Sequence, residues 1–488
     1  MRKLSKESWI LLAILVVGFL IRLEFVLISN VPWWDESVYL NLGSDLSKNP
    51  LHYSLKDSGW NDFIPIGEDE NYNSPKIGFR PPLLPYILAI FYVLNLDFLI
   101  KFLLPLMGTL TIFLVYLLGK EIFDKKIGLI SAAIFSFIPI HVIYSAKVLN
   151  DVLVTFLIVL SFLFFWKGFE KGNNKYKIFF GITLGIGLLA RYTMLWIIPL
   201  FPAYLLIRDK SLKFFKDKHL WYAIIAFFIV LIPWFVYGYF EYGNILGGFL
   251  HGFRAAAYWG GKQSWLFFFI NFWYIFSILL ILFIFSLIWI FFKKEYRKKR
   301  IYLLLLWSIF YFIMLIVMPH KEGRFVIPII PAMSLIIGYC LNKVKNYKKI
   351  IFTIIFLAVL LILFLSCIGV FINDIKTSSN INTKCFIETM NFLKAQDGDY
   401  KTISENPSII RYFTKTESSF YPNEISEDSF AELADSTSKE IYFVFNRLNS
   451  GFETDKWMSL KVILNENYKL EFQCPENPEV NFVYSNKL

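Results

Sequence analysis

The chain has 488 residues, of which 56% are hydrophobic and 18% charged, and its mean hydropathy is +0.53. Soluble domains carry about a quarter charged residues, so this composition excludes an ordinary soluble enzyme. The net charge of +11 does not indicate a nucleic-acid-binding protein, because the basic residues form short blocks between apolar segments. Many apolar runs reach the roughly 18 residues that a helix needs to cross a bilayer. We therefore expect a mainly α-helical, polytopic membrane protein.

Six basic blocks alternate with the apolar runs and predict a topology. They hold 25 of the 49 Lys and Arg residues, and the positive-inside rule places them on the cytoplasmic side. This arrangement gives about eleven transmembrane helices, a cytoplasmic N-terminus and an extracytoplasmic C-terminus. The predicted spans are 9–28, 98–119, 127–144, 151–167, 177–190, 192–207, 220–239, 265–292, 301–318, 325–341 and 350–372.

The first outer loop, about residues 29–97, contains two unusual segments. One is "VPWWDESVYL", in which Asp35 and Glu36 lie among aromatic residues. Two interpretations stay open: Asp35 caps a helix that runs from Glu36 to Leu46, or it is a partly desolvated general base. The other segment, "PPLLPYILAIFYVL", is too short to span the bilayer and predicts a helix along the outer interface, with Arg80 before it.

Two further groups of charged residues fall in predicted outer turns. "YSAKVLND" places Lys147 and Asp151 four residues apart, which suits either an exposed ion pair or an N-cap. "MPHKEGRFVIPIIPA" gathers His320, Lys321 and Arg324 at the tip of a hairpin. Such a group suits a phosphate, although lipid head groups would attract the same cations.

Two single arginines near predicted helix ends have a simpler interpretation. Arg191 lies at a tight outer turn and Arg22 lies within the first span. We expect both side chains to extend toward the membrane surface, because arginines near helix ends commonly do so.

From about residue 376 the chain changes character. Residues 376–488 carry 12 Lys and Arg against 17 Asp and Glu. The runs "IYFVFN", "YKLEFQ" and "VNFVYS" predict strands between turn residues. We therefore predict a transmembrane domain over 1–375 and a small extracytoplasmic α/β domain over 376–488. Cys385 and Cys474 could pair in that domain, while Cys340 and Cys367 lie in apolar runs that suit buried thiols.

Four motifs in order resemble one enzyme family. They are "LIRLEFVLISNVPWWDESVYLNLGSDL", "FRPPLLPYILAIF", "GKEIFDKKIGLISAAIFSFIPIHVIYSAKVLNDVLVTFLIVLSFLFF" and "HKEGRFVIPIIPA". Together they are similar to the GT-C glycosyltransferases, in the branch of dolichyl-phosphate-mannose–protein mannosyltransferases and lipid A aminoarabinose transferases. The resemblance covers roughly residues 1–340.

This resemblance implies a transferase that moves a sugar from a polyprenyl phosphate, dolichyl or undecaprenyl, to a lipid, glycan or protein acceptor. The family's catalytic acids fall on Asp35 and Asp151. The substrate-binding side chains would then be those of Glu36, Arg80, Lys147, His320, Lys321 and Arg324. Some relatives need a divalent metal ion, for which Asp35, Glu36 and Asp151 are the candidate ligands here.

Two other functions have to be weighed. A transporter or lipid flippase would also have many spans, but such proteins often show repeated halves and charges near mid-membrane. An oligosaccharyltransferase that uses pyrophosphate-linked glycans would share the chemistry of the family. The one-sided charges and the short first acidic motif favour the polyprenyl-phosphate-sugar transferase.

Overall fold

The computed structural model describes residues 5–29, 31–54, 80–258, 263–271, 275–347, 349–421, 426–435, 437–446, 454–476 and 481–486. Packing divides the chain into two units. Unit 1 consists of Met1–Leu27, Phe79–Leu84 and Phe98–Ile372, and unit 2 of Ile28–Gly78, Pro85–Asp97 and Asn373–Leu488. The composition predicts a domain boundary between residues 375 and 376, and this boundary stays a prediction.

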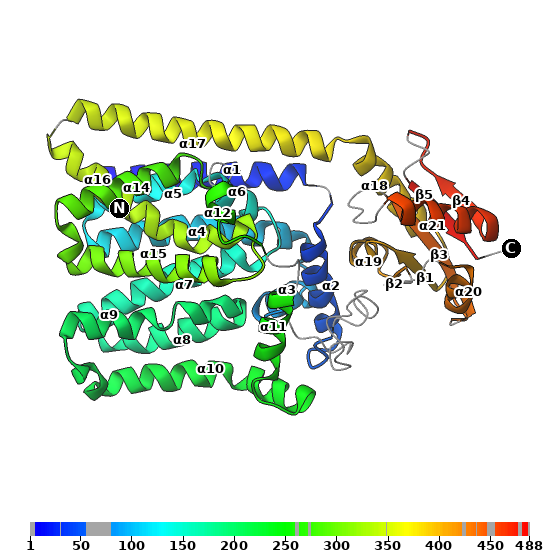
Figure 1. Cartoon of the computed structure of the whole chain (residues 1–488), viewed down its shortest axis with the longest axis horizontal. Helices are drawn as coiled ribbons and strands as arrows, with labels where there is room; N and C mark the ends of the chain where they lie inside the picture. Colours follow the sequence, from blue (N-terminus) through cyan, green and yellow to red (C-terminus); the bar gives the residue numbers. More distant parts are fainter. Residues whose placement is uncertain are drawn as a thin grey trace. The chain divides into compact units, whose positions relative to one another are not determined.

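Unit 1 is a bundle of helices, most of which run side by side (Figure 1). The main packing pairs are α4 with α5 and α7, α8 with α7 and α10, and α16 with α5 and α14. The helices wholly or mainly in this unit are α1 (Lys6–Ile28), α4 (Ile100–Ile122), α5 (Lys125–Ser136), α6 (Pro139–Ser145), α7 (Asn150–Phe165), α8 (Asn174–Ala190), α9 (Leu200–Asp209), α10 (Lys218–Tyr242), α11 (Gly247–Tyr258), α12 (Phe267–Ile270), α14 (Ile278–Phe292), α15 (Lys299–Val317), η8 (Gly323–Ile329), α16 (Ile330–Tyr347) and α17 (Lys349–Ser378).

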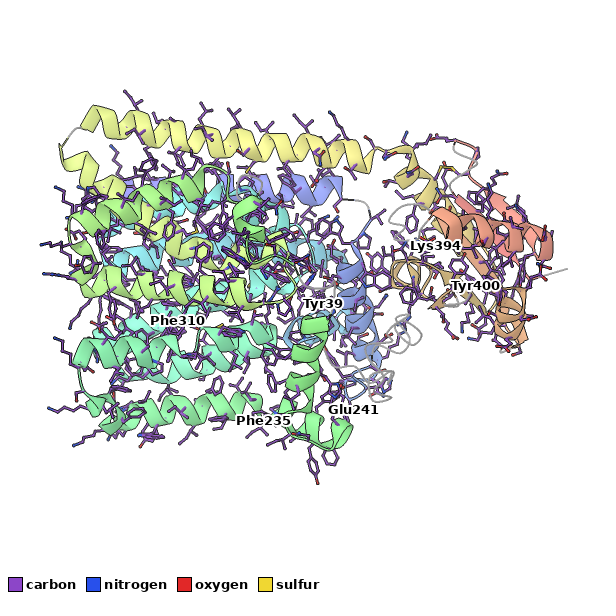
Figure 2. The ribbon with its side chains drawn as sticks, in the orientation of Figure 1. Tyr39, Phe235, Glu241, Phe310, Lys394 and Tyr400 are labelled. Atoms are coloured by element: carbon purple, nitrogen blue, oxygen red, sulfur yellow. A yellow bond between two sulfur atoms is a disulfide. The ribbon has the colours of Figure 1, made fainter. Side chains whose placement is uncertain are left out.

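Seven helices in the described part of the chain are long and apolar enough to cross a membrane, or eight if α5 and α6 form one bent span. Helix α10, on which Figure 2 labels Phe235, exposes large apolar side chains such as Phe228 and Ile232. The mainly helical, multi-span fold is thus confirmed. The predicted spans 177–190, 192–207 and 265–292 coincide with helices of at most 17 residues, α8, α9 and α14.

The predicted interfacial segment forms α3 (Leu83–Val93), a helix of 11 residues. At 1.5 Å per residue it is about half as long as the hydrocarbon core is thick. The helix is therefore too short to span the bilayer, which was the reason for not counting this segment as a span.

The third predicted span is broken, and Arg22 lies at the break. Helices α5 and α6 meet at 68°, with Pro139 as the first residue of α6. Arg22 is fully buried, so the prediction that it extends to the membrane surface is wrong. Its guanidinium donates to the carbonyl of Ser136, at 3.2 Å, and to Oγ of Ser145, at 3.2 Å. It also contacts Nδ1 of His141 at 2.8 Å.

These contacts have a physical cause in the bend. A helix that stops inside the bilayer leaves carbonyl groups without partners, and no water is present to satisfy them. Arg22 supplies donors to both sides of the break, from Ser136 before it to Ser145 after it. The arginine thereby holds the segment that leads directly into the turn before α7.

Unit 2 contains a five-stranded sheet of order β2-β1-β3-β5-β4. β1 lies parallel to β2 and β3, whereas β5 lies antiparallel to β3 and β4. The strands are β1 (Tyr400–Ser404), β2 (Glu417–Phe420), β3 (Glu440–Asn446), β4 (Lys469–Gln473) and β5 (Asn481–Ser485). The helices are α2 (Trp34–Lys48), α18 (Ile381–Lys394), α19 (Pro407–Thr414), α20 (Glu427–Asp435) and α21 (Thr454–Asn467).

The sheet is covered by helices on both faces. Phe443 of β3 belongs to a core with Phe430 of α20 and Leu460 of α21. Its neighbour Val444 belongs to the opposite core, which contains residues of α18 and α19. This alternation is the period-2 pattern of a strand that is buried on both sides. The three predicted strands are confirmed as β3, β4 and β5, and Figure 2 labels Tyr400 at the start of β1.

The four cysteines divide as the sequence suggests. Cys385 of α18 and Cys474, just after β4, form a disulfide with a Cα–Cα distance of 5.5 Å. Cys340 and Cys367 are buried free thiols in unit 1, as predicted.

Replacing Arg22 by leucine should destabilise the fold. The change leaves buried carbonyl and hydroxyl groups without a donor, which costs about 2–4 kcal/mol of unfolding free energy. The thermal midpoint of the purified protein in detergent should fall accordingly. The control is Arg297→Leu, because Arg297 is exposed; equal midpoints for the two variants would contradict the role of Arg22 at the break.

Candidate functional site

Asp151 is the centre of a buried ionic cluster in unit 1. It is the second residue of α7, and its side chain is 1% exposed. The guanidinium of Arg191 donates to Oδ1 of Asp151. The N-cap of α7 is Leu149, so Asp151 does not have the capping role considered from the sequence. The aspartate is instead a charge that an arginine 40 residues away neutralises.

Arg191 lies where α8 ends, and it is placed by local structure. The chain leaves α8 at Ala190, whose carbonyl accepts a hydrogen bond from the Asn150 side chain at 2.7 Å. This bond ties the end of α8 to the start of α7. The side chain of Arg191 is 15% exposed, and its guanidinium lies 4.8 Å from the centre of the Phe325 ring. The predicted extension toward the membrane surface is therefore wrong for Arg191 as well.

The hairpin residues form the other half of this cluster. Arg324 Nε lies 2.7 Å from Glu322 Oε2, and its Nη2 donates to Glu322 Oε1 at 2.9 Å. Arg324 Nη1 lies 4.0 Å from Asp151 Oδ2, which links the two acids through one arginine. His320 Nε2 lies 2.9 Å from Glu322 Oε1, and because a carboxylate only accepts, this nitrogen carries the proton.

The cluster keeps bonding capacity. Oδ2 of Asp151 and Nδ1 of His320 are buried and have no hydrogen-bond partner among the described residues. Buried polar atoms are normally hydrogen-bonded, and those without a partner often mark functional sites. The cluster can therefore accept at least one further hydrogen-bonding group.

Lys321 is buried beside the cluster, with 3% of its surface exposed. Its ammonium donates to the carbonyl of Met318, and its backbone N–H donates to the side chain of Gln263. Burial lowers the pKa of the Lys321 ammonium below its usual value. An anion nearby would favour the charged form of this lysine.

The elements around the cluster hold it in place. The 3₁₀ segment η8 packs against α6, α7, α15 and α16. Lys147 is buried in the turn between α6 and α7. Arg80 is half-buried three residues before α3 begins. The roles of Lys147 and Arg80 in the cluster stay predictions.

Asp35 and Glu36 belong to unit 2, in the first turn of α2. Trp33 is the N-cap, and its backbone N–H donates to Glu36 Oε2 at 2.9 Å. The capping interpretation was therefore assigned to the wrong acid, since Glu36 reaches back from the third helical position, as in a capping box. Asp35 is half-buried at the second position, and its catalytic role stays a prediction.

A metal site does not form among the described residues, which contain no suitable group of three or more His, Cys, Asp or Glu side chains. In unit 1 the carboxylates of Asp151 and Glu322 are both paired with arginines. This donor set fits a cation-rich anion site better than a metal site.

Comparison with known proteins agrees with the resemblance seen in the motifs. Residues 79–237 match the family model described as dolichyl-phosphate-mannose-protein mannosyltransferase. The chain is 24% identical over 375 residues to the undecaprenyl phosphate-alpha-4-amino-4-deoxy-L-arabinose arabinosyl transferase of Wigglesworthia glossinidia brevipalpis. That alignment covers 72% of this chain, and the chain spans 62% of the length of this curated relative.

Solved structures have the same fold. ArnT from Cupriavidus metallidurans bound to undecaprenyl phosphate has a TM-score of 0.71 at 11% identity, covering 99% of this chain and 98% of that one. The oligosaccharyltransferase AglB from Archaeoglobus fulgidus, in complex with an inhibitory peptide and a dolichol-phosphate, has a TM-score of 0.62 at 16% identity. This second match covers 99% of this chain and 74% of AglB.

Sequence reasoning found part of this cluster and missed part of it. Asp151, His320, Lys321 and Arg324 were predicted as site residues, but Glu322 was given no role and Arg191 was treated as an ordinary helix-end residue. Glu322 stood inside the quoted hairpin motif between two cations, and that position was the available signal. Nothing local to Arg191 indicates its pairing with Asp151.

The Asp151–Arg191 pair should be strongly coupled. Arg191→Ala leaves a buried carboxylate without its main partner, which costs about 3–5 kcal/mol of unfolding free energy. The double variant Asp151→Asn with Arg191→Ala should be less destabilised than the sum of the single variants. The control is Lys298→Ala, which breaks a pair whose lysine side chain is 54% exposed and costs at most about 1 kcal/mol. An Arg191→Ala loss as small as the control would contradict the pair.

Proposed function

We propose that the protein is an integral-membrane, inverting glycosyltransferase that uses a polyprenyl-phosphate-linked sugar. The acceptor is a lipid, glycan or protein on the outer face of the membrane. The observation that carries this proposal is the buried cluster of Asp151, Arg191, Glu322 and Arg324, which has bonding capacity to spare. The matched family and the ArnT fold support it.

The proposed topology has about eleven spans, with the N-terminus in the cytoplasm and the C-terminal domain outside the cell membrane. The basic blocks between spans support this orientation. The disulfide between Cys385 and Cys474 supports an outer location for that domain, because disulfides persist mainly in oxidising compartments. In this orientation the first acidic loop and the His320–Arg324 hairpin both lie on the outer side.

Asp35 is the proposed general base. An oxygen of the acceptor hydroxyl attacks the anomeric carbon while the bond from that carbon to the phosphate oxygen breaks. Asp35 takes the hydroxyl proton, and polyprenyl phosphate leaves with the bonding electron pair. Because one displacement occurs at the anomeric carbon, the configuration of the sugar inverts. Asp35 lies half-buried in the first turn of α2, and a carboxylate is a suitable general base for a hydroxyl proton.

The hairpin cations and Arg80 are proposed to neutralise the leaving phosphate. Fixed donors aimed at charge that develops in the transition state contribute more than donors that must reorganise. Arg324 is fixed by Glu322, and Nδ1 of His320, which has no partner among the described residues, can donate to the phosphate when both ring nitrogens carry a proton. Lys321, kept in a poorly hydrated position, adds a point charge.

The remaining predicted residues have positioning roles in this proposal. Asp151 orients Arg191 and Arg324 and has one oxygen left for a sugar hydroxyl. Glu36 fixes the first turn of α2 through the Trp33 N–H, so it orients Asp35 and needs no direct contact with substrate. Lys147 would face the substrate from the turn before α7. No step requires a metal ion.

The other two functions are less well supported. A transporter or flippase could also bury acids and arginines, but the matched family model and the ArnT fold do not favour one. An oligosaccharyltransferase is favoured only by the likeness to AglB, which is a likeness of fold at 16% identity.

The first functional prediction concerns Asp35. Asp35→Asn should lower the turnover of a radiolabelled polyprenyl-phosphate-sugar by about 10²–10⁴-fold, because the amide cannot take the proton. The variant should stay folded in the membrane. Asp428→Asn on α20 replaces an exposed aspartate of the same unit and should leave turnover unchanged. Normal turnover by Asp35→Asn would exclude Asp35 as the base.

The second concerns donor binding. Arg324→Ala removes charge-assisted hydrogen bonds to phosphate, each worth about 1.5–3 kcal/mol, and the KM for the donor should rise roughly 10- to 100-fold. Arg300→Ala, at an exposed arginine, is the control. Binding of undecaprenyl phosphate to the purified protein should weaken in parallel. An unchanged donor affinity would contradict the phosphate role of the hairpin.

A further inference from the structure

The helix that carries Asp35 is attached to the C-terminal part of the chain. In unit 2, α2 packs against α19, although more than 350 residues separate the two helices. α2 also packs closely on α3, because a Cβ added at Gly43 would lie 2.6 Å from Cβ of Leu88. The acid-bearing helix is thus held on two sides within unit 2.

The contact with α19 follows one stripe of α2. Ser37, Asn41 and Asp45 are spaced by four residues, so they lie on one face of the helix. Ser37 Oγ donates to Ser408 Oγ at 3.0 Å, and Asn41 Nδ2 donates to the Ser408 carbonyl at 2.8 Å. Each residue of this stripe has a partner on α19.

The third contact of the stripe is an ion pair. Arg411 donates through both terminal nitrogens to the two carboxylate oxygens of Asp45, at 2.9 and 3.0 Å. This bidentate geometry fixes direction as well as distance. The side chains of Arg411 and Asp45 are 14% and 20% exposed, so water competes only weakly.

The stripe is buried, and the packing continues to the first turn of α2. Ser37 and Ser408 are fully buried, and Asn41 is 4% exposed. Near the start of α2, the rings of Trp34 and Phe420 lie 5.4 Å apart, which brings β2 to the residue before Asp35. Burial raises the pKa of the Tyr412 phenol, and the nearby carboxylate of Glu36 raises it further.

We infer that α19 is a positioning element for the reaction, with Ser408 and Arg411 fixing the axial position and rotation of α2 and hence the direction of the Asp35 carboxylate. This inference rests on the proposed function, because it takes Asp35 as the general base. It assigns no chemistry to Arg411 itself. Polar contacts at successive turns allow only one register between the two helices. The C-terminal domain is then a structural support for the helix that carries Asp35.

The first test removes the ion pair. Arg411→Ala should lower kcat roughly 10- to 100-fold, since a displacement of about 1 Å at a catalytic group costs about that much. The donor KM should stay unchanged, because the donor phosphate is bound elsewhere. Arg411→Lys keeps the charge but loses the bidentate geometry, so its kcat should lie between that of the wild type and that of Arg411→Ala. Lys439→Ala, which breaks the pair of Lys439 with Asp399 in the same unit, should leave kcat unchanged.

Charge exchange distinguishes positioning from mere folding. The double variant Asp45→Arg with Arg411→Asp should recover most of the kcat that either single change removes. Full kcat in folded Arg411→Ala, or a loss confined to the donor KM, would overturn the inference. If Asp35→Asn also retained turnover, the proposed function itself would fail, so the two failures are distinguishable.

A covalent link tests the same point by replacing the hydrogen bond between Ser37 and Ser408 with a disulfide. Because Ser37 Oγ and Ser408 Oγ lie 3.0 Å apart, Ser37→Cys with Ser408→Cys should form a disulfide, detected by mass spectrometry of the oxidised full-length protein. The linked protein should keep its kcat, and reduction should not increase it. Inactivity that reduction reverses would mean that α2 must leave α19 during turnover, and failure to form the link would mean that the contact is absent; either result overturns the inference.

Discussion

A polar or charged group that a membrane protein buries must find its partner inside the protein, because the hydrocarbon core offers none. This constraint explains the two most unusual features of the helical unit. Arg22 supplies donors where the α5–α6 span breaks, and Arg191 neutralises Asp151 where α7 begins. Both arginines were expected to reach for the membrane surface. Both instead pair with groups that would otherwise be buried without a partner.

The two features are connected along the chain. Arg22 binds Ser145, which ends α6, and five residues later α7 begins at Asn150. The contacts on either side of this short turn determine where Asp151 can lie. The bend and the ionic cluster are therefore close along the chain, each held by its own hydrogen bonds.

The sequence predicted much of this architecture, for identifiable reasons. Long apolar runs and basic blocks are properties of consecutive residues, so the helical multi-span fold could be inferred from them. The strands β3, β4 and β5 lie in runs where apolar residues alternate or follow one another, whereas β1 and β2, "YKTIS" and "ESSF", show no such pattern and were missed. The motif order led to Asp151 and Arg324. The pairing of Asp151 with Arg191 and the capping by Glu36 depend on side-chain geometry, which spacing alone leaves ambiguous.

The charge balance of the cluster indicates why its acids are useful. Arginines alone at this position would repel one another and would lose hydration without compensation. Glu322 holds Arg324 through two of its nitrogens, while Asp151 accepts from Arg191. With Lys321, whose ammonium contacts the uncharged carbonyl of Met318, the cations outnumber the two carboxylates by one, and one positive charge remains for an incoming anion. A phosphate that entered this cluster would find donors whose orientation has already been fixed, and the carboxylates would have prepared the site by immobilising the arginines.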